Sequence, residues 1–266
     1  MKFILRQWYI PNLLIPRSFN EKVLGIKLDP NSIRFSYYAD KFAVREYIKS
    51  KIGEKYLIPL IYVDDCANAI SISKLKPNFI LKANHDSGNV YIIKEGQSYD
   101  FEKIAKLINE SLKIDYGKLY DEPWYSYIKP KVIAEKLLVK SDGTQPEDFK
   151  FHVFNSNKVI LQVDYERFND HSRSFYNEGG ELLPYSLKYK NKLRPLILED
   201  DSLTEMVCLA RTLSEGFNYV RIDFYNVDGD IFFGEMTFAH ESGLGRFKIK
   251  KHDYEWGRFF ETKDVI

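Results

Sequence analysis

The sequence predicts an α+β fold with a mostly antiparallel sheet. Three segments, Asn78–Gly96, Phe149–Phe168 and Gly216–Gly243, each consist of two β-rich runs joined by a turn or a polar loop. Helical periodicity is confined to separate segments, of which Asp100–Ile114 is the clearest. Aromatic residues make up 15% of the 266 residues, and such side chains favour strand surfaces and half-wet clefts.

The first part of the chain predicts one helix followed by strands. In Ser36–Gly53 an approximate helical stripe of apolar residues lies between a serine that can cap the helix and a glycine that can end it. Tyr56–Val63 is a short apolar run and predicts a buried strand. Asn78–Gly96 follows as strand, polar loop and strand.

The middle of the chain predicts a helix, a strand and a hairpin. Asp100–Ile114 places its apolar residues on one helical side, and Lys131–Val139 predicts a strand. Ser141–Asp148 contains Asp-Gly and Pro, which indicates a loop. Phe149–Phe168 predicts a hairpin that turns at Asn155–Asn157.

The last part predicts a helix and a final hairpin. A helix is expected over Asp201–Gly216, with Asp201 or Ser202 as its cap and Gly216 at its end. The runs "YVRIDFY" and "DIFFGEMT" then lie on either side of the turn signal Asp228-Gly229.

Composition and charge exclude several classes of protein. The net charge is +1, so no overall basic footprint for nucleic acid exists. Cys66 and Cys208 lack metal-ligand spacing and indicate reduced thiols in a cytoplasmic protein. The apolar N-terminus is interrupted by polar residues and prolines, so neither a signal peptide nor a membrane span is predicted. Trp8 and Tyr9 are expected to pack against the body, the alternative being peripheral contact with a membrane.

Two acidic residues, Asp223 and Glu235, lie within the apolar runs of the last hairpin. A strict two-residue turn would place Asp223 opposite Gly234, whereas a three-residue loop or a bulge would place it opposite Glu235. We expect the second register with a cation between the carboxylates, because opposed like charges destabilise a sheet. One or two carboxylates plus substrate phosphates are typical of a Mg²⁺ site. The alternative is an edge hairpin with solvated charges.

Two neighbours on the same face extend this prediction. Thr237 lies two residues after Glu235, so its hydroxyl is a further candidate metal ligand. Arg221 lies two residues before Asp223 and is placed to neutralise charge on a transferring phosphoryl group. The alternative for Arg221 is a cross-strand ion pair with Glu235.

Two further strands carry charges at positions where apolar residues are expected. Lys82 ends an apolar strand under a Ser-Gly loop, and this arrangement can bind phosphate oxygens; the alternative is a polar hairpin tip. Glu135 and Lys136 interrupt the strand "VIAEKLLV", whose backbone at Lys136–Leu138 can bind an adenine edge. The alternative is an edge strand protected by charges.

The segment Asp164–Asn177 is the best candidate for binding an acceptor. Arg167, His171 and Arg173 lie close together there among aromatic residues. Because arginine binds carboxylates through two hydrogen bonds, a uronic acid of a glycan can dock on this segment. The alternative is a solvated loop.

Several segments together resemble the ATP-grasp superfamily, and most closely its TupA-like branch, which is met in teichuronopeptide and surface-polysaccharide gene sets. The segments that carry the resemblance are "SFNEK", "ADKFAVREYI", "KIGEKYLIPLIYV", "FILKANHDSG", "VIAEKLL", "DFKFHVF" and "VRIDFY…IFFGEMTF", over about residues 18–250. The chain departs from the family pattern at Thr237, where the family usually has Asn, and at "HESGLG", which replaces the usual Pro-Gly.

The resemblance implies a role for each matching residue. It implies that ATP is bound by Lys41, Lys82, Ser87, Gly88, Glu135, Lys136, Leu138 and Lys150. It implies that Arg221 and Lys150 act in catalysis, that Asp223, Glu235 and Thr237 bind Mg²⁺, and that Ser242 and Gly243 help to bind the acceptor.

The fold implied is an ATP-grasp fold with a nucleotide cleft between a smaller lobe (residues 76–140) and a larger lobe (141–266), after a reduced N-terminal region (1–75). The implied activity is ATP- and Mg-dependent joining of an amine to a carboxylate through an acyl phosphate, with a uronic acid of a bacterial surface polysaccharide as acceptor. The alternatives are a glycosyltransferase of surface-polysaccharide biosynthesis and a non-catalytic protein that binds nucleotide or glycan.

Overall fold

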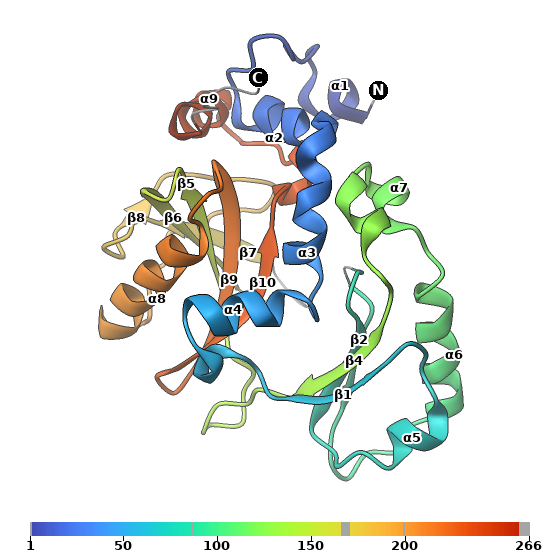
Figure 1. Cartoon of the computed structure of the whole chain (residues 1–266). Helices are drawn as coiled ribbons and strands as arrows, with labels where there is room; N and C mark the ends of the chain where they lie inside the picture. The colour runs from blue at the N-terminus through green and yellow to red at the C-terminus, as the bar shows by residue number, and fades with distance from the viewer. Residues whose placement is uncertain (1, 87, 166–170, 199, 261–266) are drawn as a thin grey trace.

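The computed structural model describes residues 2–86, 88–165, 171–198 and 200–260. These residues form two antiparallel sheets with helices around them, and the first and last described helices, α1 and α9, lie at one end of the molecule (Figure 1). The prediction of an α+β fold with mostly antiparallel sheet is therefore confirmed.

The smaller lobe is built on a four-stranded antiparallel sheet. Its elements are β1 (Leu60–Asp64), α5 (Ala69–Ser73), β2 (Phe79–Ala83), β3 (Val90–Ile93), α6 (Phe101–Ser111), α7 (Tyr116–Tyr120), η3 (Pro123–Tyr127) and β4 (Val132–Lys136). The strand order is β1-β4-β2-β3, so β1, which precedes residue 76, also belongs to this sheet. Apolar residues of β2 and of the amphipathic helix α6 share one buried cluster, which includes Phe79, Leu81 and Ile108.

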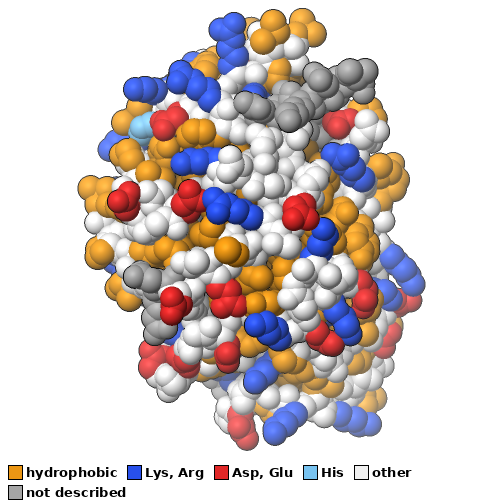
Figure 2. Space-filling view, turned by 60° about the vertical axis from the view of Figure 1, so that its left-hand side comes forward, with side chains coloured by type: hydrophobic (Ala, Val, Ile, Leu, Met, Phe, Trp, Pro, Cys, Tyr) orange, Lys and Arg blue, Asp and Glu red, His pale blue; other side chains and the backbone are white. Residues whose placement is uncertain are grey.

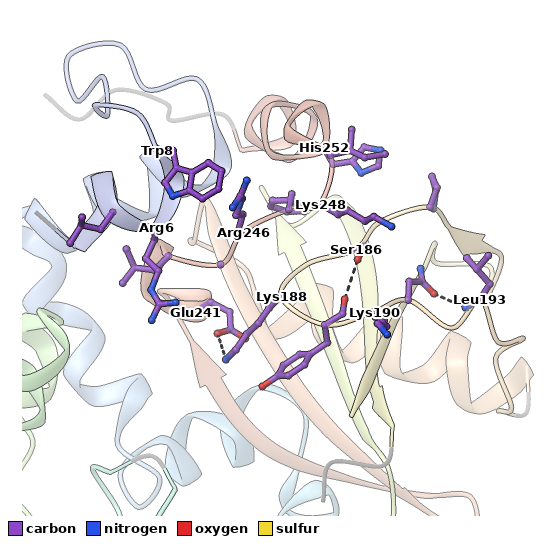
Figure 3. A pocket seen from close by; sticks show the side chains of 18 residues that line it. Arg6, Trp8, Ser186, Lys188, Lys190, Leu193, Glu241, Arg246, Lys248 and His252 are labelled. Atoms are coloured by element: carbon purple, nitrogen blue, oxygen red, sulfur yellow. Dashed lines mark hydrogen bonds and ion pairs between the residues drawn. The ribbon is translucent and has the colours of Figure 1, made fainter. Parts of the chain in front are cut away.

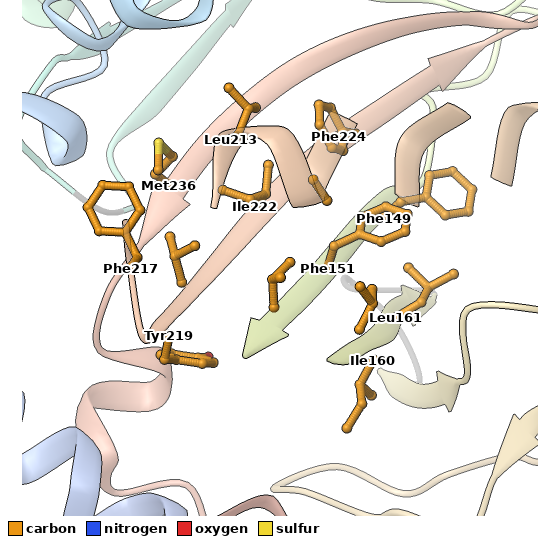
Figure 4. Packing of buried hydrophobic residues seen from close by; sticks show 14 of the residues in the cluster. Phe149, Phe151, Ile160, Leu161, Leu213, Phe217, Tyr219, Ile222, Phe224 and Met236 are labelled. Carbon is orange, nitrogen blue, oxygen red and sulfur yellow. The ribbon is translucent and has the colours of Figure 1, made fainter. Parts of the chain in front are cut away.

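The larger lobe is built on a six-stranded antiparallel sheet with strand order β10-β9-β5-β6-β7-β8. Its elements are β5 (Asp148–Phe154), β6 (Lys158–Tyr165), β7 (Ser172–Tyr176), β8 (Leu182–Leu183), α8 (Asp200–Leu213), β9 (Tyr219–Val227) and β10 (Asp230–Thr237). Leu213 of α8 lies in one buried cluster with Phe151 and Ile222 of the sheet (Figure 4). Because side chains alternate along a strand, the neighbouring residues of β5 and β9 point to the opposite face.

Helices from both ends of the chain cover one end of the larger sheet (Figure 1). Glu21 and Ser18 form a capping box at the start of the second helix, which fixes where that helix begins. Phe19 then packs edge-on against Trp256 of the last helix. The remaining elements are α1 (Lys2–Gln7), α2 (Phe19–Leu28), η1 (Pro30–Phe35), α3 (Ser36–Ala39), α4 (Val44–Lys51), η2 (Glu54–Tyr56), η4 (His240–Gly243) and α9 (Lys250–Phe259).

The expectation that Trp8 is buried against the body is wrong. Trp8 is 73% exposed, although one face of its ring contacts the Arg246 guanidinium, 3.8 Å from the ring centroid. Tyr9 is partly buried and its hydroxyl hydrogen-bonds with Ser18 Oγ at 2.9 Å. Hydrophobic and basic side chains are exposed together at this upper end of the molecule (Figure 2). Among the described residues, no helix is long and apolar enough to cross a membrane.

The single helix expected over Ser36–Gly53 is instead two helices, α3 and α4, with a break after Asp40. The Asp40 carboxylate accepts hydrogen bonds from the N–H groups of Phe42 and Ala43, at 2.8 and 3.2 Å, and from Asn84 Nδ2 at 2.8 Å. Such side-chain bonds compete with continuous helical hydrogen bonding. The break has a consequence for the site, because it places Lys41 beside the small lobe.

Three other predicted boundaries need correction. The helix expected from Asp201 already includes Asp200, so neither Asp201 nor Ser202 is its cap. The strand expected from Tyr56 begins at Leu60, because Glu54–Tyr56 form a 3₁₀ turn. The strand expected up to Val139 ends at Lys136.

Candidate active site

The last hairpin brings Asp223 and Glu235 opposite each other. The strands join through a two-residue turn, and the register then shifts between Phe233 and Glu235, so that Gly234 is an extra residue in β10. A Cβ atom at Gly234 would lie 3.1 Å from the carbonyl oxygen of Asp223, which is tight enough to favour glycine at this bulge. The predicted facing of the two carboxylates is therefore confirmed, and the bulge is what produces it.

Arg221 supplies the cation that the two carboxylates need. Its Nε and Nη2 atoms donate to the two oxygens of Asp223 at 2.6 and 2.7 Å, and Nη2 also donates to Glu235 Oε1 at 2.6 Å. The cross-strand ion pair considered as an alternative for Arg221 is thus present. Burial disfavours the charged guanidinium, but Asp223 and Glu235 outweigh burial and raise its pKa.

Lys150 completes this buried cluster from the next strand. Its Nζ lies 2.8 Å from Asp223 Oδ2 and 3.1 Å from Asp148 Oδ2. Burial disfavours the Lys150 ammonium, yet the two carboxylates hold its pKa above the ordinary value. Burial likewise acts to raise the pKa of Asp223, but Arg221 and Lys150 hold it below its usual range. All three side chains are therefore charged at neutral pH.

Two histidines, His152 and His240, line the same cluster and were not predicted as site residues. His240 Nδ1 lies 3.0 Å from Arg221 Nη1, and the ring of His152 packs edge-on against that of His240 with centroids 4.6 Å apart. Burial lowers the pKa of His152 to about 3 and the pKa of His240 well below its ordinary value. Both rings are neutral at pH 7, so His240 accepts the hydrogen bond that helps to orient Arg221.

A second group of ion pairs lies on the small-lobe side. Lys82 Nζ lies 2.6 Å from Glu135 Oε2, and Arg45 Nη1 lies 3.1 Å from Glu135 Oε1. Lys41 donates to the carbonyl oxygen of Asp86 at 2.6 Å, and its Nζ is 4.0 Å from Glu235 Oε2. Burial lowers the pKa of Lys41. Lys41 thus links the carboxylate hairpin of the large lobe to the polar loop of the small lobe.

A cavity of about 470 Å³ lies between the two sheets. Ile80 and Ile92 of the small lobe and Tyr225 and Gly234 of the large lobe line it, and the predicted hinge crosses it. The Lys136 N–H donates to the carbonyl oxygen of Pro59, and the Leu137 N–H donates to the carbonyl oxygen of Asn78. Within the described part of the chain, the N–H of Leu138 has no acceptor. Of the backbone donors predicted to bind adenine, the one at Leu138 therefore remains open.

Of the loop Ser87-Gly88, which is predicted to bind the ATP phosphates, the structure describes Gly88. Gly88 has φ +113°, a conformation that favours glycine, and nothing lies within 4 Å of where its Cβ would be. Ser87 and Arg167 lie outside the described residues.

The remaining predicted acceptor residues divide into two places. Arg173 binds Asp164 through Nε at 2.6 Å and Nη2 at 3.3 Å, and His171 Nε2 lies 3.5 Å from Asp164. Ser242 Oγ instead accepts from Lys27 Nζ at 2.6 Å. Gly243 packs closely on α2, where a Cβ would lie 3.2 Å from the Asn20 carbonyl oxygen. Ser242 and Gly243 thus contact α2, while the preceding Glu241 reaches Arg173, 3.1 Å from Nη1 to Oε1. Their role in binding the acceptor stays a prediction.

The hard oxygen ligands of the hairpin fit a magnesium ion bound together with a triphosphate. In this structure Arg221 Nη2 occupies the place between the two carboxylates, so a metal ion held there would have to displace it. The Glu235 side chain is 38% exposed, and the Thr237 hydroxyl lies 3.4 Å from it. Among the described residues no group of three or more His, Cys, Asp or Glu is arranged to hold a metal by itself. Phosphate oxygens would have to complete the coordination.

A family model described as TupA-like ATPgrasp matches residues 21–261. The chain belongs to the TupA-like ATP-grasp family. The predicted ATP-grasp fold is thereby confirmed, and the cavity between the two sheets lies where the family resemblance led us to expect the nucleotide. No curated protein matches the chain.

Among solved structures, an L-amino acid ligase from Bacillus licheniformis is 12% identical with a TM-score of 0.50, and the match covers 85% of this chain and 49% of that one. A D-alanine–D-alanine ligase from Bacillus anthracis is 14% identical with a TM-score of 0.43, over 76% of this chain and 57% of that one. The chain thus spans about half the length of these ligases. The likeness to the L-amino acid ligase concerns the fold alone.

Proposed function

We propose that this protein is an ATP- and Mg-dependent ligase that joins an amine to a carboxylate. The observation that carries the proposal is the ionic cluster of Arg221, Asp223, Lys150 and Glu235, with Lys41 4.0 Å from Glu235. It adjoins a cavity between the two sheets that Lys82, Asp148 and Gly234 line. Fixed cations around a cavity of this size suit a triphosphate whose terminal group is transferred.

The nucleotide would enter this cavity with its base against the apolar walls. Leu138 offers its open N–H group to the adenine edge, and the phosphates would extend toward Lys82 and Lys41. Glu135 orients Lys82 through the 2.6 Å ion pair. A bound magnesium ion would neutralise charge on the phosphate oxygens, and Glu235, Asp223 and Thr237 are the residues that would hold it.

The chemistry then needs no general base for its first step, because a carboxylate is ionised at pH 7. One acceptor oxygen attacks the γ-phosphorus, the bond from that phosphorus to the bridging oxygen breaks, and ADP leaves. Arg221 is placed to stabilise charge on the transferring group. The amine nitrogen then attacks the acyl carbon, phosphate leaves and the nitrogen loses a proton, which yields an amide.

We infer that the acceptor is a uronic acid of a bacterial surface polysaccharide or of its precursor. The resemblance to the TupA-like branch and the arginine at position 173 support this substrate class. We expect the protein to act in the cytoplasm, where ATP is available.

The test is release of ADP and phosphate from ATP with uronic-acid acceptors and a panel of amines and amino acids. Glu235→Gln should lower the rate at least about 100-fold, a loss typical of removing one charge-stabilising group. Glu54→Gln is the matched control, because Glu54 is an exposed partner of Lys49. Release of UDP or GDP from a nucleotide sugar would instead favour a glycosyltransferase. ATP binding without turnover with any pair would favour a non-catalytic protein.

A further inference from the structure

A second, larger cavity of about 1310 Å³ lies at the end of the molecule that carries the N-terminal segment. It is lined by that segment, by residues 184–193 after β8 and by residues 241–252, which run from η4 into the first turn of α9 (Figure 3). These three stretches are far apart in sequence. The basic residues that line the cavity are Arg6, Lys188, Lys190, Arg246 and Lys248.

The positive charge of this cavity is not compensated by protein carboxylates. Of the described residues that line it, Glu241 alone is acidic, and Glu241 already pairs with Arg173 and Lys188. Within the described chain, Lys190 and Lys248 have no ion-pair partner. A concave surface with unpaired cations concentrates anions.

A chain of ion pairs joins this cavity to the nucleotide cavity. Lys188 Nζ lies 2.8 Å from Glu241 Oε2, Arg173 Nη1 lies 3.1 Å from Glu241 Oε1, and Arg173 Nε lies 2.6 Å from Asp164 Oδ1. Asp164 also lines the cavity between the two sheets. Arg173 is therefore a buried cation that reaches toward both cavities.

Glu241 occupies this position at a conformational cost. Its backbone has φ +48° and the following Ser242 has φ +56°, a left-handed conformation that residues other than glycine rarely adopt. The strained backbone holds a carboxylate on Lys188 and Arg173. Another carboxylate that takes its place would keep both cations paired and would free the strained segment.

We propose that the larger cavity binds an acidic saccharide. In the free protein the Glu241 carboxylate pairs with Lys188 and Arg173, and a carboxylate of the bound saccharide would replace it there. The identity of the saccharide as the acceptor rests on the proposed ligase function. The cationic wall would bind the neighbouring acidic sugars, and the exposed ring of Trp8, which lines the cavity, would contact a sugar ring.

The test is a binding titration without ATP, with oligogalacturonate of about six sugars as probe. Trp emission should report binding, because Trp8 is exposed at the cavity whereas Trp124 and Trp256 are fully buried. Lys190→Gln together with Lys248→Gln should weaken binding at least about 10-fold and flatten its salt dependence. Glu241→Gln should tighten binding roughly 5-fold, about 1 kcal/mol. Lys118→Gln, whose side chain is 85% exposed on α7, is the control and should bind like wild type.

The proposal is overturned if the double lysine variant binds oligogalacturonate like wild type, or if a neutral maltohexaose binds equally well. It is also overturned if inorganic polyphosphate binds tightly through these lysines while oligogalacturonate does not, since the ligand would then carry phosphate. The expected binding pattern with no ADP release for any amine would refute the ligase function and leave the docking site intact. ADP release that is insensitive to the lysine and Glu241 variants would refute the docking site alone.

Discussion

Replacing Asp223 by alanine should lower the stability of the protein as well as its activity. The Asp223 side chain is 2% exposed and accepts two hydrogen bonds from Arg221 and one from Lys150. Its removal leaves two cations inside the protein with fewer partners. Breaking a buried pair in this way costs about 3–5 kcal/mol, a large part of the roughly 5–15 kcal/mol by which domains are stable.

Glu235→Ala is the matched comparison on the opposite strand. Glu235 also contacts Arg221, but its side chain is 38% exposed, so water and salt screen the pair. The loss of stability should be below about 1 kcal/mol. Both variants should lose ligase activity, so comparing Asp223→Ala with Glu235→Ala separates a stabilising role from a catalytic one.

The assay is urea denaturation of both variants and of wild type, followed by circular dichroism, together with thermal melting. Asp223→Ala should melt roughly 6–20 °C below wild type. Because the folded pKa of Asp223 is lowered, its contribution is present above the unfolded value of about 3.9 and is lost as pH falls through the folded pKa. The difference between Asp223→Ala and wild type should therefore shrink below pH 4. An unfolding free energy for Asp223→Ala within about 1 kcal/mol of wild type at pH 7 would refute this reasoning.

Three further predictions follow from other parts of the structure. Glu135→Gln should weaken ATP binding about 10-fold in calorimetry, because the lysine of β2 loses its ion-pair partner; unchanged affinity would argue against that role. His152 has a folded pKa of about 3, below its unfolded value near 6.5, so stability should be full above pH 6.5 and fall toward pH 3. A denaturation series should show a shallower fall for His152→Gln, and an equal slope would contradict the assignment. Gly257→Ala should unfold the junction of α2 and α9, because its Cβ would lie 2.1 Å from the carbonyl oxygen of Arg17. In Gly25→Ala the added Cβ meets nothing within 4 Å and should stabilise α2 by about 0.5–1 kcal/mol. Similar melting temperatures for the two variants would count against this packing.

Local pattern was sufficient for the elements whose hydrogen bonds and apolar faces are contained in nearby sequence. The amphipathic helix α6 and the hairpin of β5 and β6 were predicted with boundaries close to those observed. The helix over Ser36–Gly53 was mispredicted because the Asp40 side chain accepts from the N–H groups of Phe42 and Ala43 and so breaks the helix. Asn84, 44 residues away, holds the same carboxylate, and local propensity does not contain that contact.

The sequence by itself determined the ATP-grasp fold, because strand motifs in the family's order carry it, and it placed Asp223 and Glu235 on the two strands of one hairpin. That the two carboxylates face each other depends on the bulge at Gly234, which the structure shows. Only the tertiary structure decided that Arg221 lies between these carboxylates and that His240 orients it. It alone also assembled the basic cavity from the N-terminal segment and two distant loops. The physical reason is that ion pairing and cavity shape depend on distances between segments, which periodicity along the chain does not contain.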